Sequence, residues 1–334
     1  FNNNYMKKLI LIPFFLIFAS ADNSIVLLNG AMSDKRDNDN SLADCYITCW
    51  GDSLTSMGGW TSHLENLSNM TVYNGGTGGE NARTILARQG GDAMLVNNII
   101  IPAEAEPVII ANRRSTGGIK TTLGHIVTPL LQGSPHFNPC FIGDTKGVLR
   151  WTGSNHLDLT GNWEFTRLQP GDQVVIDKPT PIRTNFDINR NAPHLQIIFI
   201  GQNGGYDDLT ELIFQHKLLI SYSRAKNSII LGLSSGTAKQ RAEYENTMRN
   251  EFGKYFISLR EILSAPIYNS DQDKIINCYG LFHAGLTPNA DDLDDIKIGR
   301  VPQQLLIDSV HFTEITRTVI GNSIYKACKD LSIF

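Results

Sequence analysis

One serine in this chain occupies a place where a nucleophile could be exposed. Ser53 lies in the segment GDSLT, residues 51–55, directly after a short apolar-alternating stretch that should form a strand. Gly, Asp and Ser are also common turn residues, so turn chemistry alone could explain the segment. A serine nucleophile needs a base, an orienting carboxylate and hydrogen-bond donors for the developing oxyanion.

An aspartate and a histidine near the end of the chain could supply the carboxylate and the base. Asp308 and His311 are three residues apart in LLIDSVHFTE, directly before a predicted helix. At this spacing the carboxylate can hold the imidazole and fix its tautomer, and His311 would then take the proton from Ser53. The competing interpretation is a helix-capping aspartate beside a surface histidine.

Two further segments could supply oxyanion donors in addition to the Ser53 backbone amide. NGGTGGEN, residues 74–81, contains four glycines, so its backbone can approach a substrate closely; Gly79 is the best candidate. GQN, residues 201–203, ends a later strand, and the side-chain amide of Asn203 could donate a further hydrogen bond. Either segment alone is more often just a turn.

The elements that must position these residues alternate between strand and helix. Residues 43–94 follow the order strand, helix, strand, helix, and the pattern returns in residues 193–334. The last predicted helix has apolar residues at three- and four-residue spacing. Such alternation predicts a parallel sheet, whose strand ends meet at one edge where ligands bind. We interpret the two blocks as one interrupted sheet.

The interruption, residues 95–192, has a different pattern. Gly, Pro and Thr recur about every eight to twelve residues, which favours short antiparallel strands and a compact inserted β module. An insertion of this length needs its own core. Trp151, Trp163 and Phe165 could be sugar-stacking platforms, although aromatic residues in a small β module more often form the core.

The four segments GDSLT, NGGTGGEN, GQN and DSVH occur in the order and setting of the SGNH, or GDSL, hydrolase family, and this chain resembles that family. The resemblance covers about residues 43–94 and 193–334. It implies an α/β class with a flavodoxin-like three-layer α/β/α fold, and a serine esterase mechanism.

The resemblance also implies a role for each motif residue. Ser53 resembles the nucleophile, His311 the base, Asp308 its orienter, and Gly79 and Asn203 the oxyanion donors beside the Ser53 amide. One departure concerns the residue after Asn203. The family often has Asp there, whereas this chain has Gly204, which puts the support of that loop in question.

A second serine motif offers an alternative. Ser234 lies in GLSSG, which fits the G-x-S-x-G turn of α/β-hydrolases. That fold needs an acid and a histidine from two separate loops, and Asp308 and His311 are too close together for that. We therefore interpret Ser234 as the end of a strand in the SGNH-like sheet.

The first 42 residues predict export. Residues 1–21 contain two lysines, an apolar run LILIPFFLIF and the sequence Ala19-Ser20-Ala21, the order of a cleavable signal peptide. The apolar run is roughly half of what spans a bilayer, so we expect no stable membrane anchor. Residues 22–42 are polar and are predicted to be a linker. The expected location is secreted or periplasmic.

Composition argues against other partners. The net charge is −4 and charged residues make up 19% of the 334 residues, so no basic field for nucleic acid exists. The five cysteines form no CxxC pair, and no Gly-Lys-Ser/Thr follows the glycine-rich loop; neither a metal nor another cofactor is expected. Buried free cysteines fit at least as well as disulfides. The acidic run NADDLDDIK lacks EF-hand spacing and predicts a solvated acidic loop.

The substrate class follows only by analogy. Export and an inserted β module are similar to the plan of peptidoglycan and polysaccharide O-acetylesterases of the same family, so we expect an acylated glycan or small ester. A lipid esterase or lysophospholipase is the alternative enzyme. A glycan-binding protein with an inactive hydrolase core is the third reading, against which the complete set of motif residues argues.

Overall fold

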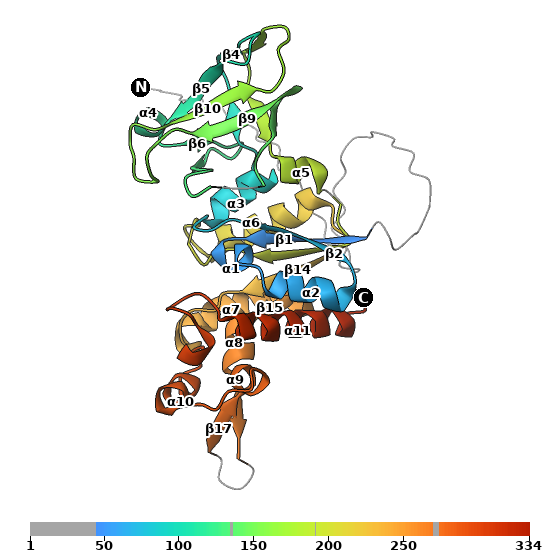
Figure 1. Ribbon diagram of the computed structural model, residues 1–334. Coiled ribbons are helices and arrows are strands. Elements are labelled where there is room, and N and C mark those ends of the chain that lie inside the picture. The colour runs from blue at the N-terminus through green and yellow to red at the C-terminus, as the bar shows by residue number, and fades with distance from the viewer. Residues whose placement is uncertain (1–44, 134–135, 191, 270–273) are drawn as a thin grey trace, which may run out of the picture. The chain divides into compact units, whose positions relative to one another are not determined.

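The structure, a computed structural model, describes residues 45–133, 136–190, 192–269 and 274–334. The predicted signal peptide and linker lie outside these residues. Within the described ranges, five parallel strands form one sheet in the order β15-β14-β13-β1-β2 (Figure 1). They are β1 (Tyr46–Gly51), β2 (Thr71–Gly76), β13 (Leu195–Phe199), β14 (Asn227–Gly232) and β15 (Phe256–Ser258). Counted along the chain this is the order 2-1-3-4-5 of flavodoxin-like sheets, and the predicted α/β class with a parallel sheet is confirmed.

Helices connect these strands close to the predicted positions. They are α1 (Ser53–Ser56), α2 (Trp60–Ser68), α3 (Ala82–Gln89), α6 (Leu209–Ser223), α7 (Ala238–Phe252), α8 (Leu259–Ser264) and α11 (Glu314–Asp330). The capping residues of α7 explain why this helix begins where it does. The Thr237 hydroxyl accepts a hydrogen bond from the Gln240 amide while the Gln240 side chain accepts one from the Thr237 amide, so both free N–H groups are satisfied.

The core lies on both faces of the sheet. Successive residues of a strand point to opposite faces, and β13 is buried throughout because each face is covered by helices. Ile197 and Phe199 pack with Trp60 of α2 and Ile320 of α11, helices that lie side by side in Figure 1. Residues Ile198, Ile200, Ile85 of α3, Leu212 of α6 and Met248 of α7 belong to the opposite core cluster.

Residues between α3 and β13 form a second sheet of antiparallel pairs in the order β3-β12-β8-β9-β10-β5. Its strands are β3 (Leu95–Val96), β5 (Pro107–Asn112), β8 (Cys140–Ile142), β9 (Thr145–Trp151), β10 (Asn162–Arg167) and β12 (Thr180–Arg183). Two short pairs accompany it, β4 (Ile99–Ile101) with β11 (Val174–Ile176) and β6 (Ile119–Lys120) with β7 (Ile126–Val127), and so do helices α4 (Arg113–Thr116) and α5 (Asn185–Asn189). Trp163 and Phe165 are fully buried in its core, so they are not exposed sugar platforms.

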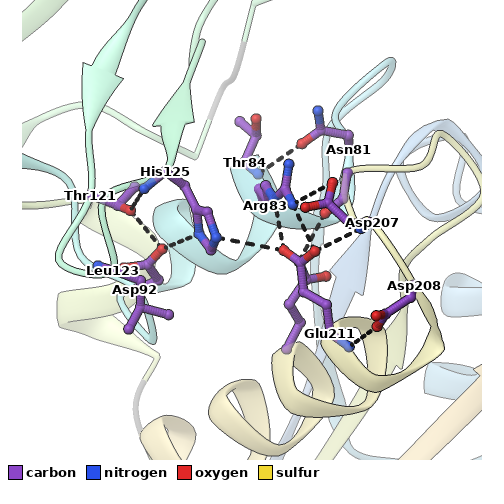
Figure 2. Close-up of polar contacts among 12 residues, drawn as sticks. Asn81, Arg83, Thr84, Asp92, Thr121, Leu123, His125, Asp207, Asp208 and Glu211 are labelled. Atoms are coloured by element: carbon purple, nitrogen blue, oxygen red, sulfur yellow. Dashed lines mark hydrogen bonds and ion pairs between the residues drawn. The ribbon is translucent and has the colours of Figure 1, made fainter.

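A polar network joins the loop between β6 and β7 to α3 and α6 (Figure 2). The buried carboxylate of Asp92 accepts hydrogen bonds from the segment 121–123 and lies 2.9 Å from Nδ1 of His125. The other imidazole nitrogen of His125 lies 3.5 Å from Oε1 of Glu211 on α6. Arg83 of α3 donates two hydrogen bonds to the same carboxylate, at 2.8 and 2.7 Å. His125 therefore bridges a carboxylate at the end of α3 and one on α6.

The segment between β15 and α11 contains small elements that the sequence pattern did not predict. They are the 3₁₀ turn η3 (Gln303–Leu305), the hairpin β16 (Pro266–Tyr268) with β17 (Ile275–Cys278), and helices α9 (Tyr279–His283) and α10 (Ala290–Lys297). A further 3₁₀ turn, η2 (Gly253–Tyr255), lies between α7 and β15. The acidic run forms α10, so its prediction as a solvated loop is wrong. Asn289 caps that helix and Asp292 returns the hydrogen bond, which leaves Asp292 fully buried. Among the described residues, no helix is long and apolar enough to cross a membrane.

Candidate active site

Ser53 lies at the carboxyl end of β1 and is the first residue of α1. The turn depends on its two neighbours. A side chain on Gly51 would come within 2.1 Å of the Thr55 hydroxyl and 2.8 Å of the Phe199 carbonyl, so only glycine fits there. Asp52 caps the turn, because its carboxylate accepts a 2.9 Å hydrogen bond from the Leu54 amide. Gly51 and Asp52 thus shape the sharp strand-to-helix turn that carries Ser53.

Ser53, His311 and Asp308 form one continuous chain of hydrogen bonds. Nε2 of His311 lies 2.9 Å from Oγ of Ser53, and Nδ1 lies 2.7 Å from Oδ2 of Asp308. Ser53 and His311 are 258 residues apart in the sequence. The loop that carries Asp308 and His311 is closed by a 2.7 Å hydrogen bond from the Ile307 amide to the His311 carbonyl, just before the Thr313 cap of α11.

The protonation of this chain follows from the Asp308 environment. The backbone N–H of His311, its imidazole and the backbone N–H of Val310 all donate to this carboxylate, and together they lower the pKa of Asp308 to about 2. An ionised carboxylate only accepts, so the imidazole carries its proton on Nδ1. Nε2 then presents a lone pair to Ser53, whose hydroxyl donates to it. This is the arrangement in which a histidine can accept a proton from serine.

The competing interpretation of Asp308 as a helix cap does not describe its contacts. The residue that caps α11 is Thr313, whose hydroxyl accepts from the Thr316 amide. Asp308 caps its own loop instead and also holds the imidazole, while 53% of its side chain stays exposed. The His311 side chain is 31% exposed, but its Nε2 is hydrogen-bonded to Ser53, so it is not merely a surface histidine.

The two predicted oxyanion donors lie in neighbouring loops. The side-chain amide of Asn203 donates to the carbonyl of Glu80 at 3.1 Å and to Oδ2 of Asp52 at 3.4 Å, so it connects the loops that follow β1 and β2. Gly79 has φ +70°, and a side chain there would collide with Gln132. Its neighbour Gly78 is the glycine nearest to Ser53, since a side chain on Gly78 would lie 4.0 Å from Ser53 Cβ.

Asp52 is a second carboxylate beside the serine that the motif analysis did not single out. It is 1% exposed, and burial raises its pKa to about 6, against the lowering effect of the Leu54 amide and of His311. Its two oxygens hold the Leu54 amide and the Asn203 side chain. The only signal in the sequence was its position inside the GDSLT segment.

A buried ion pair supports the glycine-rich loop from behind. Arg88 is completely buried, donates to Glu80 at 2.8 Å and to the carbonyl of Gly75 at 2.8 Å, and stacks over the ring of Trp50. Glu80 is 7% exposed, and its burial raises its pKa while Arg88 opposes the rise. The pair fixes the backbone between Gly75 and Glu80, and with it Gly78 and Gly79.

A cleft of about 930 Å³ opens next to the serine. It runs along the edge strand β2 and is bounded by the loop before β8 and by α5. Its lining includes Tyr73, Gly78, Gln132, His136, Phe186 and Arg190. Ser53 itself is not among the lining residues, and the cleft comes nearest to it at Gly78. The cleft would therefore hold a part of the bound molecule that extends away from an ester at Ser53.

The other candidate residues do not assemble into sites. Ser234 is 4% exposed after β14, with no histidine hydrogen-bonded to it among the described residues. Across the ranges the structure describes, no group of His, Cys, Asp and Glu could hold a metal ion. The five cysteines are free, and four of them are buried.

Comparisons with known proteins add one structural likeness. No protein-family model matches this chain, and no curated protein does. Among solved structures it is similar to the "Structure of a putative lipolytic protein of G-D-S-L family from Desulfitobacterium hafniense DCB-2", with 11% identity over 85% of this chain and 99% of that chain, and a TM-score of 0.39.

Proposed function

We propose that this protein is a serine esterase of the SGNH type, built on a flavodoxin-like three-layer fold with a β module inserted at residues 95–192. The observation that carries the proposal is the hydrogen-bond chain from Ser53 through His311 to Asp308 at the carboxyl edge of a parallel sheet. One hydroxyl, one imidazole and one carboxylate in this order perform acyl transfer without any cofactor.

In the first half of the reaction, Oγ of Ser53 attacks the ester carbonyl while its proton moves to Nε2 of His311. Asp308 stabilises the imidazolium through the hydrogen bond at Nδ1. The new negative charge falls on the carbonyl oxygen, beside the Ser53 amide, the backbone at Gly78 and Gly79, and Asn203. The C–O bond to the alcohol then breaks, and His311 returns its proton to the departing oxygen.

In the second half, water replaces the alcohol. His311 takes a proton from the water, the hydroxide attacks the acyl carbon, and the bond to Ser53 breaks as His311 protonates Oγ. The exposed side of His311 leaves a path for the water and for the departing alcohol. The products are a carboxylic acid and the alcohol, and the enzyme returns to its starting state.

The substrate belongs to the same proposal. We propose a short acyl ester, an O-acetyl group on carbohydrate, processed by an exported enzyme. The cleft beside Ser53 supports a substrate in which a small acyl group is attached to a large alcohol. An acetyl group alone would leave almost all of the cleft volume of about 930 Å³ unfilled. Its lining of Asn, Gln, Thr, Tyr and His side chains suits hydroxyl-rich ligands better than a lipid chain.

The test is hydrolysis of 4-nitrophenyl esters of increasing acyl length by wild type and by three variants. Ser53→Ala and His311→Ala should each lower kcat by several orders of magnitude, since removal of either member disables the unit. Ser234→Ala is the matched serine control and should leave the rate unchanged. A preference for acetate over octanoate supports the short-acyl substrate, and the reverse preference supports a lipid esterase. An inactive Ser234→Ala with an active Ser53→Ala would contradict the proposal.

A further inference from the structure

The cleft beside Ser53 contains a cation, Arg190, that forms no ion pair with any residue the structure describes. Arg190, directly after α5, lines the cleft, and its guanidinium carbon lies 3.7 Å from the centre of the Tyr73 ring. Its Nη1 donates a 2.7 Å hydrogen bond to the Asn189 carbonyl. Stacking on the ring and the contact to Asn189 fix the plane of the guanidinium and leave its remaining N–H groups for a ligand.

Three arginines on helices α3 and α8 form ion pairs with carboxylates. Arg83, Arg88 and Arg260 each lie within 3.0 Å of a Glu oxygen. Arg190 has no such ion pair among the described residues, and none of the cleft-lining residues that the structure describes is Asp or Glu. The cleft therefore has a net positive end, at which a negative group would be attracted and a positive one repelled.

The position of Arg190 determines which part of a substrate it can meet. Tyr73 lies three residues before Gly76 in β2, and Gly76 pairs with Gly51 next to the serine turn. At the rise of a strand this separation is about 10 Å. An acetyl group attached to Ser53 does not extend that far, so a group at Arg190 belongs to the alcohol part of the ester.

We propose that the cleft binds the alcohol part of the substrate and that Arg190 selects an alcohol that carries an anionic group, a carboxylate or a phosphate. This inference rests on the proposed esterase function and specifies its substrate class as an acidic glycan. The flat guanidinium suits both anions, since each presents two oxygens to a pair of N–H groups.

His136 on the opposite wall of the cleft adds polarity without adding charge. Its ring packs edge-on against Phe186, and burial, together with the nearby Arg88 and Arg190, lowers its pKa. The imidazole is thus neutral at neutral pH and can donate or accept a hydrogen bond to a sugar hydroxyl. The selective charge comes from Arg190 alone.

The experiment compares three O-acetylated dextrans with the same degree of acetylation: carboxymethyl-dextran, dextran phosphate and unmodified neutral dextran. Acetate release is measured for wild type, Arg190→Gln, Arg190→Lys and Arg114→Gln. Arg114 is an exposed residue of α4 outside the cleft lining, so its variant has the same change of net charge as Arg190→Gln. Hydrolysis of 4-nitrophenyl acetate by every variant reports the chemistry at Ser53 separately.

Wild type should prefer at least one anionic dextran over the neutral one, and the preferred one identifies the anion. Arg190→Gln should lose about 10- to 100-fold in kcat/KM on that polymer, mainly through KM, because charged hydrogen bonds of this kind are worth roughly 1.5–3 kcal/mol. Arg190→Lys should recover much of the loss, and Arg114→Gln should behave as wild type. All variants should hydrolyse 4-nitrophenyl acetate at equal rates.

Equal rates on charged and neutral dextran, or an equal loss on both in Arg190→Gln, would overturn the proposal. Should wild type cleave none of these esters, the esterase function fails, and the charge selection is tested by binding. Calorimetry with unacetylated carboxymethyl-dextran and dextran phosphate on Ser53→Ala, with and without Arg190→Gln, then decides it. Binding that does not depend on Arg190 would reject the selection.

Discussion

Gly51, Asp52 and Ser53 occupy positions that each demand a particular residue. Gly51 lies so close to Thr55 and Phe199 that any side chain would collide, and the Asp52 carboxylate both caps α1 and meets the Asn203 amide. Ser53 then projects its hydroxyl toward His311. Two of the three residues therefore shape the turn, and the third is the nucleophile that we propose.

The role of Asn203 is tested by its truncation to alanine. Its amide donates to the Glu80 carbonyl and to Asp52, and in the transition state one proton could turn to the oxyanion. Removal of such a donor costs on the order of 3–4 kcal/mol of barrier. We expect Asn203→Ala to lower kcat for 4-nitrophenyl acetate by about 100-fold with little change of KM.

The control is Gln202→Ala, which removes an amide of the same loop that donates to Ser235 instead. It should keep near-normal kcat, and circular dichroism should show both variants folded. A rate within about threefold of wild type for Asn203→Ala would assign the oxyanion to backbone donors alone.

Burial of Asp52 predicts a dependence of stability on pH. Its pKa is about 6 in the folded protein against 3.8 in its ordinary state, so between these values the folded form holds more protons than the unfolded form. The stability contributed by the protonated group is complete below about pH 4 and is lost as the pH rises through 6. The loss amounts to roughly 3 kcal/mol.

Urea unfolding of wild type and Asp52→Asn at pH 4 and pH 7 measures this effect. The variant keeps the cap but cannot ionise, so its free energy of unfolding should rise relative to wild type between the two pH values. Asp144→Asn, at an exposed position, should follow wild type. A constant difference between wild type and Asp52→Asn would contradict the buried charge.

At the scale of elements, the site is a set of loops at the carboxyl ends of neighbouring strands. The turns after β1, β2 and β13 supply Ser53, the two glycines and Asn203, and the loop before α11 brings His311 to them. Because these strands are parallel and adjacent, their ends share one edge of the sheet. Segments far apart in sequence thus meet without any long connection through the core.

The loop network in Figure 2 predicts a large stability effect at Asp92. Its buried carboxylate accepts from Thr121 and Leu123 and pairs with His125. Asp92→Ala leaves the buried Thr121 hydroxyl without its acceptor and removes the partner of the Leu123 amide and of His125, and we expect a loss of about 2–3 kcal/mol in the free energy of unfolding.

Chemical denaturation followed by tryptophan fluorescence measures the Asp92 effect. Asp158→Ala is the matched control, because Asp158 also accepts several loop hydrogen bonds but is only partly buried. Its variant should be clearly less destabilised. Equal losses in both would show that the loop bonds, and not their burial, determine stability.

At the scale of the whole molecule, most of the second sheet belongs to one segment whose two ends are adjacent, so the segment can be deleted. Val96 pairs with Thr180 in the ladder between β3 and β12, so the two ends of the segment 97–179 lie side by side. Phe186, just after that segment, packs in the core of the parallel sheet and must stay. We expect deletion of 97–179 with a short Gly-Ser turn to give a folded protein.

The deleted form should hydrolyse 4-nitrophenyl acetate within about tenfold of wild type, since neither Ser53 nor His311 contacts the removed residues through a described hydrogen bond. Acetate release from polysaccharide should fall much further, because Gln132 and His136 of the cleft are lost. Failure to fold would instead show that the two sheets share their stability.

Several features could be predicted from local pattern alone. Apolar residues at three- and four-residue spacing predicted the last helix, observed as α11, because this signal acts within a few turns of chain. The order of the four motif segments identified Ser53, Asp308, His311 and Asn203, since a turn that exposes a nucleophile restricts its neighbours. The acidic run was misread as a loop, because its capping partner Asn289 satisfies Asp292 in a way that composition does not reveal.

Only the tertiary structure decided the rest, because it depends on contacts between residues far apart in sequence. The elevated pKa of Asp52 arises from burial under loops that follow other strands. Arg88 pairs with Glu80, whereas Arg190 stacks on Tyr73. These contacts depend on which side chains come together in the folded chain, and the charge composition does not contain that information. Sequence spacing specified the residues that could react; packing specified their electrostatic surroundings and the cleft that a substrate would occupy.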